Sequence, residues 1–77
     1  MDTNLMAELK LKFQQIIDLI ALENTVDSQK RLEKLTVEVN DLIDFAKTDK
    51  DLQEMSQYQV LINHLQLKID ILKTSLN

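Results

Sequence analysis

The C-terminal third of this chain carries an uninterrupted heptad pattern of apolar residues. Seven positions alternate steps of three and four residues: Met55, Tyr58, Ile62, Leu65, Ile69, Leu72 and Leu76. This alternation places every member on one stripe of an α-helix, as in the seam of a coiled coil. The pattern therefore predicts a helix over about residues 50–75 that packs lengthwise against another helix.

A matching pattern lies upstream, within a predicted helix over about residues 29–46. The segment that follows is polar, and its residues Thr48 and Asp51 fit a capping box, in which a hydroxyl caps the first free amides of a helix. Because so short a break joins antiparallel neighbours, we expect a helical hairpin. Its expected core combines the seam positions of both helices: Leu32, Leu35, Val39, Leu42, Met55, Ile62, Leu65, Ile69 and Leu72.

A third helical pattern precedes the hairpin, over about residues 4–23, where the apolar residues at helical spacing are Leu5, Leu9, Phe13, Ile16 and Ile20. The weak helix formers at 24–28 predict a break, either a turn or a kink, so this helix either folds back on the hairpin or stands apart. The 77 residues include no Gly and no Pro, which sheet-rich folds need at their turns. We therefore expect one all-α domain over residues 1–77, a coiled-coil-like antiparallel hairpin with an additional N-terminal helix.

The last predicted helix has more apolar surface than a hairpin can cover. A second stripe consists of Val60, His64, Leu67 and Ile71, with Tyr58 expected at its edge. A chain of this length buries only about 60–65% of its unfolded surface, and the absence of Cys excludes disulfides as staples. We therefore expect this second stripe to bind a partner or, when the chain is alone, another copy of itself.

Residues capable of catalysis or metal binding are scarce. His64 is the single histidine, there is no Cys, and no glycine-rich loop could cradle a phosphate. No nucleophile lies at an obvious spacing from a general base. We therefore expect no catalytic residues, no metal site, no cofactor and no enzymatic activity.

The charge pattern bears on partners and location. Nine Lys and Arg face thirteen Asp and Glu, for a net charge of −4, and the cations form no cluster that could neutralise nucleic-acid phosphates. No stretch approaches the roughly 20 apolar residues of a membrane span. The start Met1-Asp2-Thr3-Asn4 also lacks the basic residues that open a secretory signal. We expect a cytoplasmic protein that binds neither nucleic acid nor membrane.

The last fifty residues resemble the small E-type co-chaperones of type III secretion needle proteins. The resemblance rests on Gln57-Tyr58-Gln59-Val60 at the start of the last helix, the Leu- and Ile-rich stretch after it, and the upstream helix that ends in Asp41-Leu42-Ile43-Asp44-Phe45-Ala46-Lys47. It covers about residues 29–77. It implies a cytoplasmic hairpin that pairs with a helical-repeat chaperone, and through it with a needle subunit, which the pair keeps soluble and unpolymerised.

This chain departs from that family in two respects. The break at Lys47-Thr48-Asp49-Lys50 lacks the glycine often found in the family's loop, and the helix at 4–23 is additional to a bare hairpin. Two other functions stay open from the residues alone. The chain could be a self-associating structural coiled coil, or a helical inhibitor or antitoxin that blocks an enzyme through a helix face.

Overall fold

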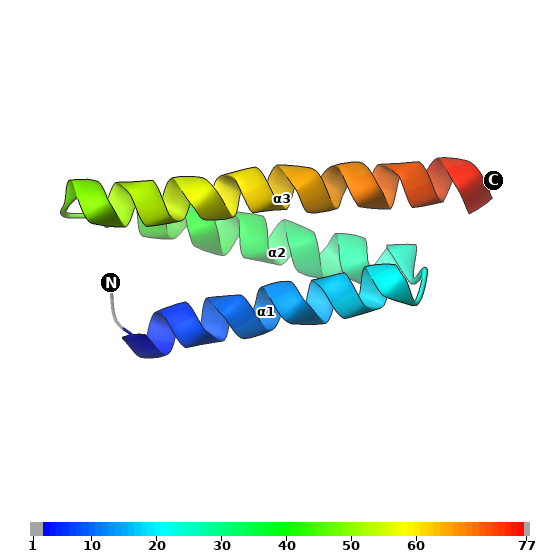
Figure 1. Ribbon diagram of the computed structural model, residues 1–77, viewed down its shortest axis with the longest axis horizontal. Coiled ribbons are helices and arrows are strands. Elements are labelled where there is room, and N and C mark those ends of the chain that lie inside the picture. The colour runs from blue at the N-terminus through cyan, green and yellow to red at the C-terminus, as the bar shows by residue number, and fades with distance from the viewer. Residues whose placement is uncertain (1–2, 77) are drawn as a thin grey trace.

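The computed structural model describes the backbone of residues 3–76 and the side chains of residues 3–75. This part of the chain folds into three helices and no strands: α1 (Thr3–Ala21), α2 (Thr25–Asp44) and α3 (Asp49–Leu76). The expected all-α fold is confirmed. Helices α2 and α3 form an antiparallel hairpin, and α1 folds back along α2 (Figure 1).

The break between α1 and α2 is shorter than the sequence predicts. Glu23 adopts a left-handed conformation with φ of 60°, and the Asn24 side chain caps α2 by accepting a hydrogen bond from the Asp27 backbone N–H at 3.2 Å. Helix α2 therefore begins at Thr25, four residues before the predicted start. Thr25, Asp27 and Ser28 are weak formers of helix interiors, but short polar side chains are favoured at the start of a helix. The break is thus a tight turn that reverses the chain.

The break between α2 and α3 follows the capping signal in the sequence. The Thr48 hydroxyl oxygen accepts a hydrogen bond from the Asp51 backbone N–H at 3.1 Å, as the capping box predicts. Helix α2 ends at Asp44, two residues before its predicted end, and α3 begins at Asp49. Four residues therefore reverse the chain and set the register of the hairpin.

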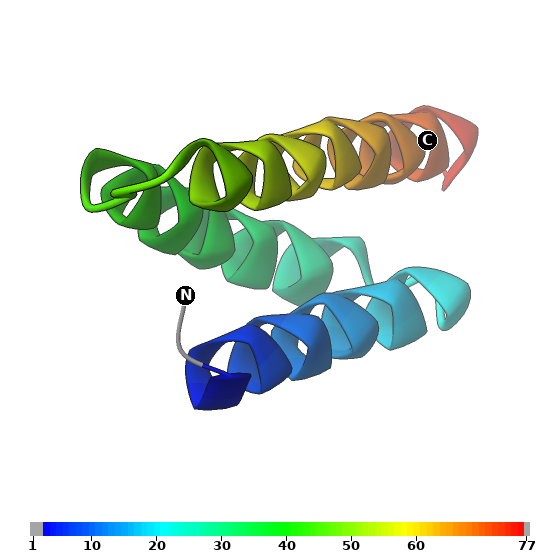
Figure 2. The same ribbon diagram turned by 60° about the vertical axis from the view of Figure 1, so that its left-hand side comes forward.

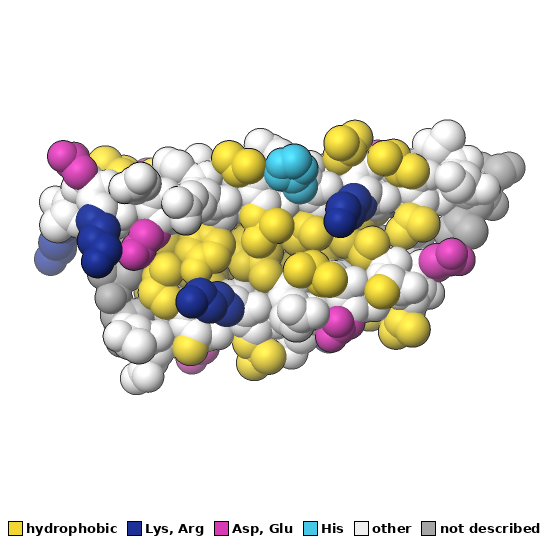
Figure 3. Space-filling model, in the orientation of Figure 1, with side chains coloured by type: hydrophobic (Ala, Val, Ile, Leu, Met, Phe, Trp, Pro, Cys, Tyr) yellow, Lys and Arg dark blue, Asp and Glu magenta, His cyan; other side chains and the backbone are white. Residues whose placement is uncertain are grey.

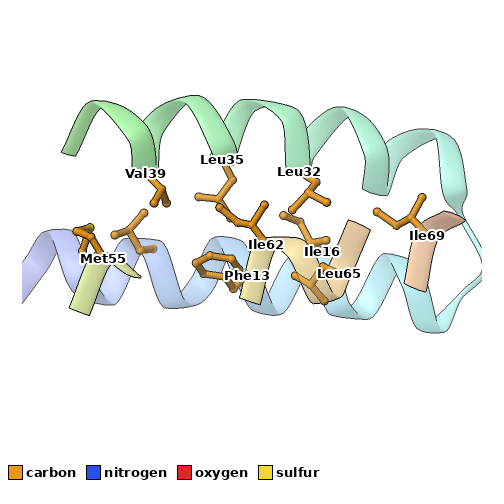
Figure 4. Packing of buried hydrophobic residues seen from close by; sticks show 10 residues of the cluster. Phe13, Ile16, Leu32, Leu35, Val39, Met55, Ile62, Leu65 and Ile69 are labelled. Carbon is orange, nitrogen blue, oxygen red and sulfur yellow. The ribbon is translucent and has the colours of Figure 1, made fainter. Parts of the chain in front are cut away.

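A single hydrophobic core joins the three helices. Its ten buried residues are Leu9, Phe13 and Ile16 from α1, Leu32, Leu35 and Val39 from α2, and Met55, Ile62, Leu65 and Ile69 from α3. Their side chains point toward one another between the helices (Figure 4). Of the expected hairpin core, Leu42 and Leu72 are only half-buried. The side chain of Leu76, the last seam position, lies outside the described residues.

Helix α2 is the central element of the bundle. It packs against both other helices, whereas α1 and α3 contact each other least and lie on either side of it (Figure 2). The result is a thin body with extents of 44 × 19 × 14 Å. A band of apolar side chains remains visible between α1 and α3 (Figure 3). The core is therefore open on one side, and both flanking helices keep faces that no other described element covers.

Candidate partner interface

The outer stripe of α3, defined as Val60, His64, Leu67 and Ile71, is exposed along its whole length. The three apolar side chains are 55%, 58% and 56% exposed, and His64 is exposed as well. Successive helical residues turn by about 100°, so positions spaced 4, 3 and 4 form one line along the helix axis. This line lies opposite the face that carries Met55, Ile62 and Ile69. The structure therefore brings together the residues that the sequence assigned to a partner surface.

Tyr58 does not lie at the edge of this stripe, where the sequence analysis expected it. Its ring is half-buried and stacks on Phe13 of α1, with ring centroids 5.2 Å apart and planes inclined by 12°. As a member of the heptad seam, Tyr58 faces α1 and the core, away from Val60 and Leu67. Burial, followed by the negative charge of Glu54, raises the pKa of the Tyr58 hydroxyl. Tyr58 thus belongs to the packing that holds α1 against α3.

A polar network on the opposite side of the hairpin holds α3 in its rotational setting. Gln29 and Gln66 exchange two hydrogen bonds between their side-chain amides, at 3.0 and 2.7 Å. Lys73 Nζ donates to the Gln29 oxygen at 3.2 Å, and Gln66 also donates to Asp70 at 2.9 Å. Reciprocal amide pairs require both side chains in one geometry, so a rotated α3 would lose them. The network therefore helps to keep the outer stripe facing solvent.

Charges are confined to the borders of the outer stripe. Lys68 and Asp70 flank it, and between Val60 and Ile71 its line holds only apolar groups and the imidazole of His64. In Figure 3 the imidazole, in cyan, lies among apolar side chains along the rim that α3 forms. An apolar line with polar borders is the pattern of a helix face that packs against another helix.

Other exposed apolar side chains include Leu11 and Ile17 on α1 and Leu22 just after it, and a band of apolar side chains stays visible between α1 and α3 (Figure 3). Val26 and Val37 share the outer face of α2, but Lys30 and Glu33 separate them. Phe45 lies alone in the turn after α2. Single exposed apolar residues are normal on soluble proteins, whereas aligned ones indicate binding. The outer stripe of α3 is a candidate binding surface because its three exposed apolar side chains follow one line along a single helix.

A polar cleft lies between the first turns of α1 and α3. It is open to solvent, encloses about 630 Å³, and is lined on its charged side by Lys10, Lys50, Asp51 and Glu54. The two cations and the two carboxylates have a net charge of zero. Within the described residues, no three Asp, Glu or His side chains gather closely enough to hold a metal ion. The cleft offers no arrangement that indicates a particular reaction.

The ion pair that joins α1 to α2 stabilises the packing of these helices and, like the cleft, indicates no particular reaction. Lys12 Nζ lies 2.7 Å from Glu38 Oε2, and Arg31 donates to the side chain of Gln15 at 3.2 Å. Both contacts cross the side of α1 that faces α2, and exposed contacts of this kind contribute at most about 1 kcal/mol. They orient α1 rather than form a site.

Comparisons with known proteins do not assign this chain to a family. No family model matches it, and neither the curated proteins nor the solved structures contain a significant match. Of the helices in the described part of the chain, none is long and apolar enough to cross a membrane.

Proposed function

We propose that this chain is a non-catalytic co-chaperone that acts in the cytoplasm. In this proposal it binds a helical-repeat chaperone and helps to keep a type III secretion needle subunit soluble and unpolymerised. The observation that supports the proposal most strongly is the outer stripe of α3, which begins at the last residue of the Gln57-Tyr58-Gln59-Val60 element and exposes three large aliphatic side chains in a line.

The proposed mechanism is mutual burial of apolar helix faces. Helical repeats offer concave grooves, and an amphipathic helix binds such a groove through residues spaced by three and four positions. Complete burial of a large aliphatic side chain contributes about 1.5–3 kcal/mol relative to full exposure. Because Val60, Leu67 and Ile71 are a little more than half exposed, together they offer about 3 kcal/mol to a partner. Burial would also remove an aggregation-prone surface from both proteins.

The test is an affinity capture of the tagged full chain from an extract of its own organism, with the bound proteins identified by mass spectrometry. We expect stoichiometric recovery of a small helical-repeat protein, with or without a needle subunit. Leu67→Glu should abolish this recovery while the circular dichroism spectrum stays helical. Val37→Glu is the matched control, because Val37 is 59% exposed on α2 and receives the same charge.

Two results would refute the proposal. One is recovery of the tagged chain without a helical-repeat protein. The other is recovery of such a protein that Leu67→Glu and Val37→Glu reduce equally, because binding would then not depend on the outer stripe.

A further inference from the structure

The spacing of residues in the outer stripe of α3 is the same whether it is read from the N-terminal or from the C-terminal end of the helix. Its four positions are separated by steps of four, three and four residues, so they are symmetric about the point between Leu65 and Gln66. A stripe with this property can meet a second copy of itself in antiparallel orientation. Val60 of one copy then meets Ile71 of the other, and His64 meets Leu67. A two-fold interface requires this kind of self-complementarity.

We propose that, in the absence of another partner, two copies of this chain pair through the outer stripe of α3 in antiparallel orientation. In an antiparallel pair, residues that flank the stripe on the same side of each helix face each other. Asn63 then lies beside Asp70 of the second copy, where its amide can donate to the carboxylate. Lys68 lies beside Leu61 of the second copy and can lay its aliphatic stem over it. No two like charges meet.

The parallel alternative is less favourable for the same residues. A parallel pair in register would place His64 against its own copy and repeat every layer with itself. It would also align the dipoles of two 28-residue helices in the same direction, whereas the antiparallel pair opposes them. The face is also free of obstruction, because α1 and α2 both pack on the other side of α3.

The exposed area of the chain is consistent with a dimer. A monomer with this mass of 9.0 kDa exposes about 4,850 Å² by the general scaling of area with mass. The chain exposes 5394 Å². The excess of about 540 Å² is two-thirds of the roughly 800 Å² that one partner contributes to a standard interface. This excess is spread over the elongated body, which measures 44 × 19 × 14 Å, and the outer stripe accounts for part of it.

One consequence rests on the proposed function. If the outer stripe also binds a helical-repeat chaperone, pairing with a second copy and binding the chaperone exclude each other. The dimer would then protect the apolar face until the chaperone displaces the second copy. The dimer itself does not depend on that function, because its geometry follows from α3 alone.

The first test measures the mass of the purified full chain by light scattering over rising concentration. We expect about 18 kDa, twice the monomer mass of 9.0 kDa. Leu67→Glu should give a helical monomer, and Val37→Glu should remain a dimer. A wild-type mass of 9.0 kDa at all concentrations would overturn the proposal, as would equal dissociation by both variants. If Leu67→Glu loses its helicity, Ile71→Lys replaces it.

The second test determines the orientation of the two helices. Because the chain contains no Cys, a nitroxide on Asn63→Cys or on Ser56→Cys labels a single site. With a rise of 1.5 Å per residue, antiparallel pairing separates the two labels along the axis by about 8 Å at position 63 and about 28 Å at position 56. Equal distances at both positions would indicate a parallel pair and contradict the proposed geometry.

The two proposals fail separately. A wild-type monomer that still captures a helical-repeat protein through the outer stripe removes the dimer and leaves the proposed function. A dimer with the expected label distances that captures no such protein supports the dimer and removes the proposed function.

Discussion

Helix α3 has two apolar faces with similar residues and opposite environments. Leu65 is 3% exposed and Ile69 is fully buried, whereas Leu67 and Ile71, each two residues further on, are more than half exposed. Helix propensity and residue type do not distinguish these faces. They differ because α1 and α2 cover the inner face, and no described element covers the outer one. The same kind of side chain therefore stabilises the fold at one position and is available for binding two positions later.

The strongest test of the difference between the two faces of α3 is to place the same charge on each of them. Leu65→Glu would bury a carboxylate in the core and remove a side chain that packs against α1 and α2. Loss of a buried Leu alone costs about 2–5 kcal/mol, and an unpaired buried charge adds to that. Since a domain of this size has only a few kcal/mol of stability, we expect Leu65→Glu to be unfolded by circular dichroism at 25 °C.

Leu67→Glu provides the internal control for that experiment. It introduces the same residue two positions along the same helix, on a side chain that is already mostly in water. We expect its helicity to equal that of the wild type. Cooperative melting of Leu65→Glu near the wild-type temperature would show that the inner face is not the core of the protein in solution.

A milder pair of substitutions measures how far the two faces differ. Ile69→Ala should lower the free energy of unfolding by about 2–5 kcal/mol, because it removes buried methylenes and leaves a cavity. Ile71→Ala should lower it by less than about 0.5 kcal/mol. Urea denaturation of both variants in the Leu67→Glu background excludes any contribution from pairing of chains. Equal losses at the two positions would contradict the asymmetry of α3.

Much of this fold could be predicted from periodicity alone. The heptad steps identified the seam of α3 and its partner positions on α2, because a regular helix places such residues on one face whatever surrounds them. Of the five apolar positions that the sequence placed on one face of the first helix, Leu9, Phe13 and Ile16 are buried, and Leu5 and Ile20 are half-buried. Its direction could not be predicted, because the reversal depends on Glu23 in a left-handed conformation, which has no glycine signal in this chain.

Less of the candidate partner interface than of the fold could be predicted from the sequence. Val60, Leu67 and Ile71 could be identified as surplus apolar residues, because the hairpin seam was already complete without them. The sequence analysis expected Tyr58 at the edge of the outer stripe, but its ring stacks on Phe13. Periodicity could not predict this contact, because Phe13 is 45 residues away in the sequence. The Gln29–Gln66 pair also had no sequence signal, since polar residues on a helix face look like solvated ones until the neighbouring helix is in place.

The Gln29–Gln66 pair lies at one border between the inner and outer faces of α3. A double-mutant cycle measures what the pair contributes to the free energy of unfolding. We expect Gln29→Ala and Gln66→Ala each to cost about 1 kcal/mol, with a coupling free energy near 1 kcal/mol, because the reciprocal amide bonds are partly buried. Asn40 and Gln59 provide a matched control, since they join the same helices through one exposed hydrogen bond at 3.2 Å. Their coupling should be close to zero. Equal coupling in both cycles would show that the border pair has no special role.

The smallest expected effect is the pH dependence that Tyr58 confers on the inner face. Because burial and the Glu54 charge raise its pKa above the ordinary value of 10.0, the folded chain retains the phenolic proton after the unfolded chain has lost it. Above about pH 10 the unfolded state therefore binds fewer protons, and the stability of the fold decreases as pH rises. Urea midpoints measured from pH 9 to 11 should decrease more steeply for the wild type than for Tyr58→Phe, which lacks the only tyrosine. Glu54→Gln should reduce the steepness partially, because it removes the secondary cause. If the urea midpoints of the wild type and Tyr58→Phe decreased equally with pH, the Tyr58 ring would be exposed to water in solution. Helix α1 would then not cover the inner face of α3 at Tyr58.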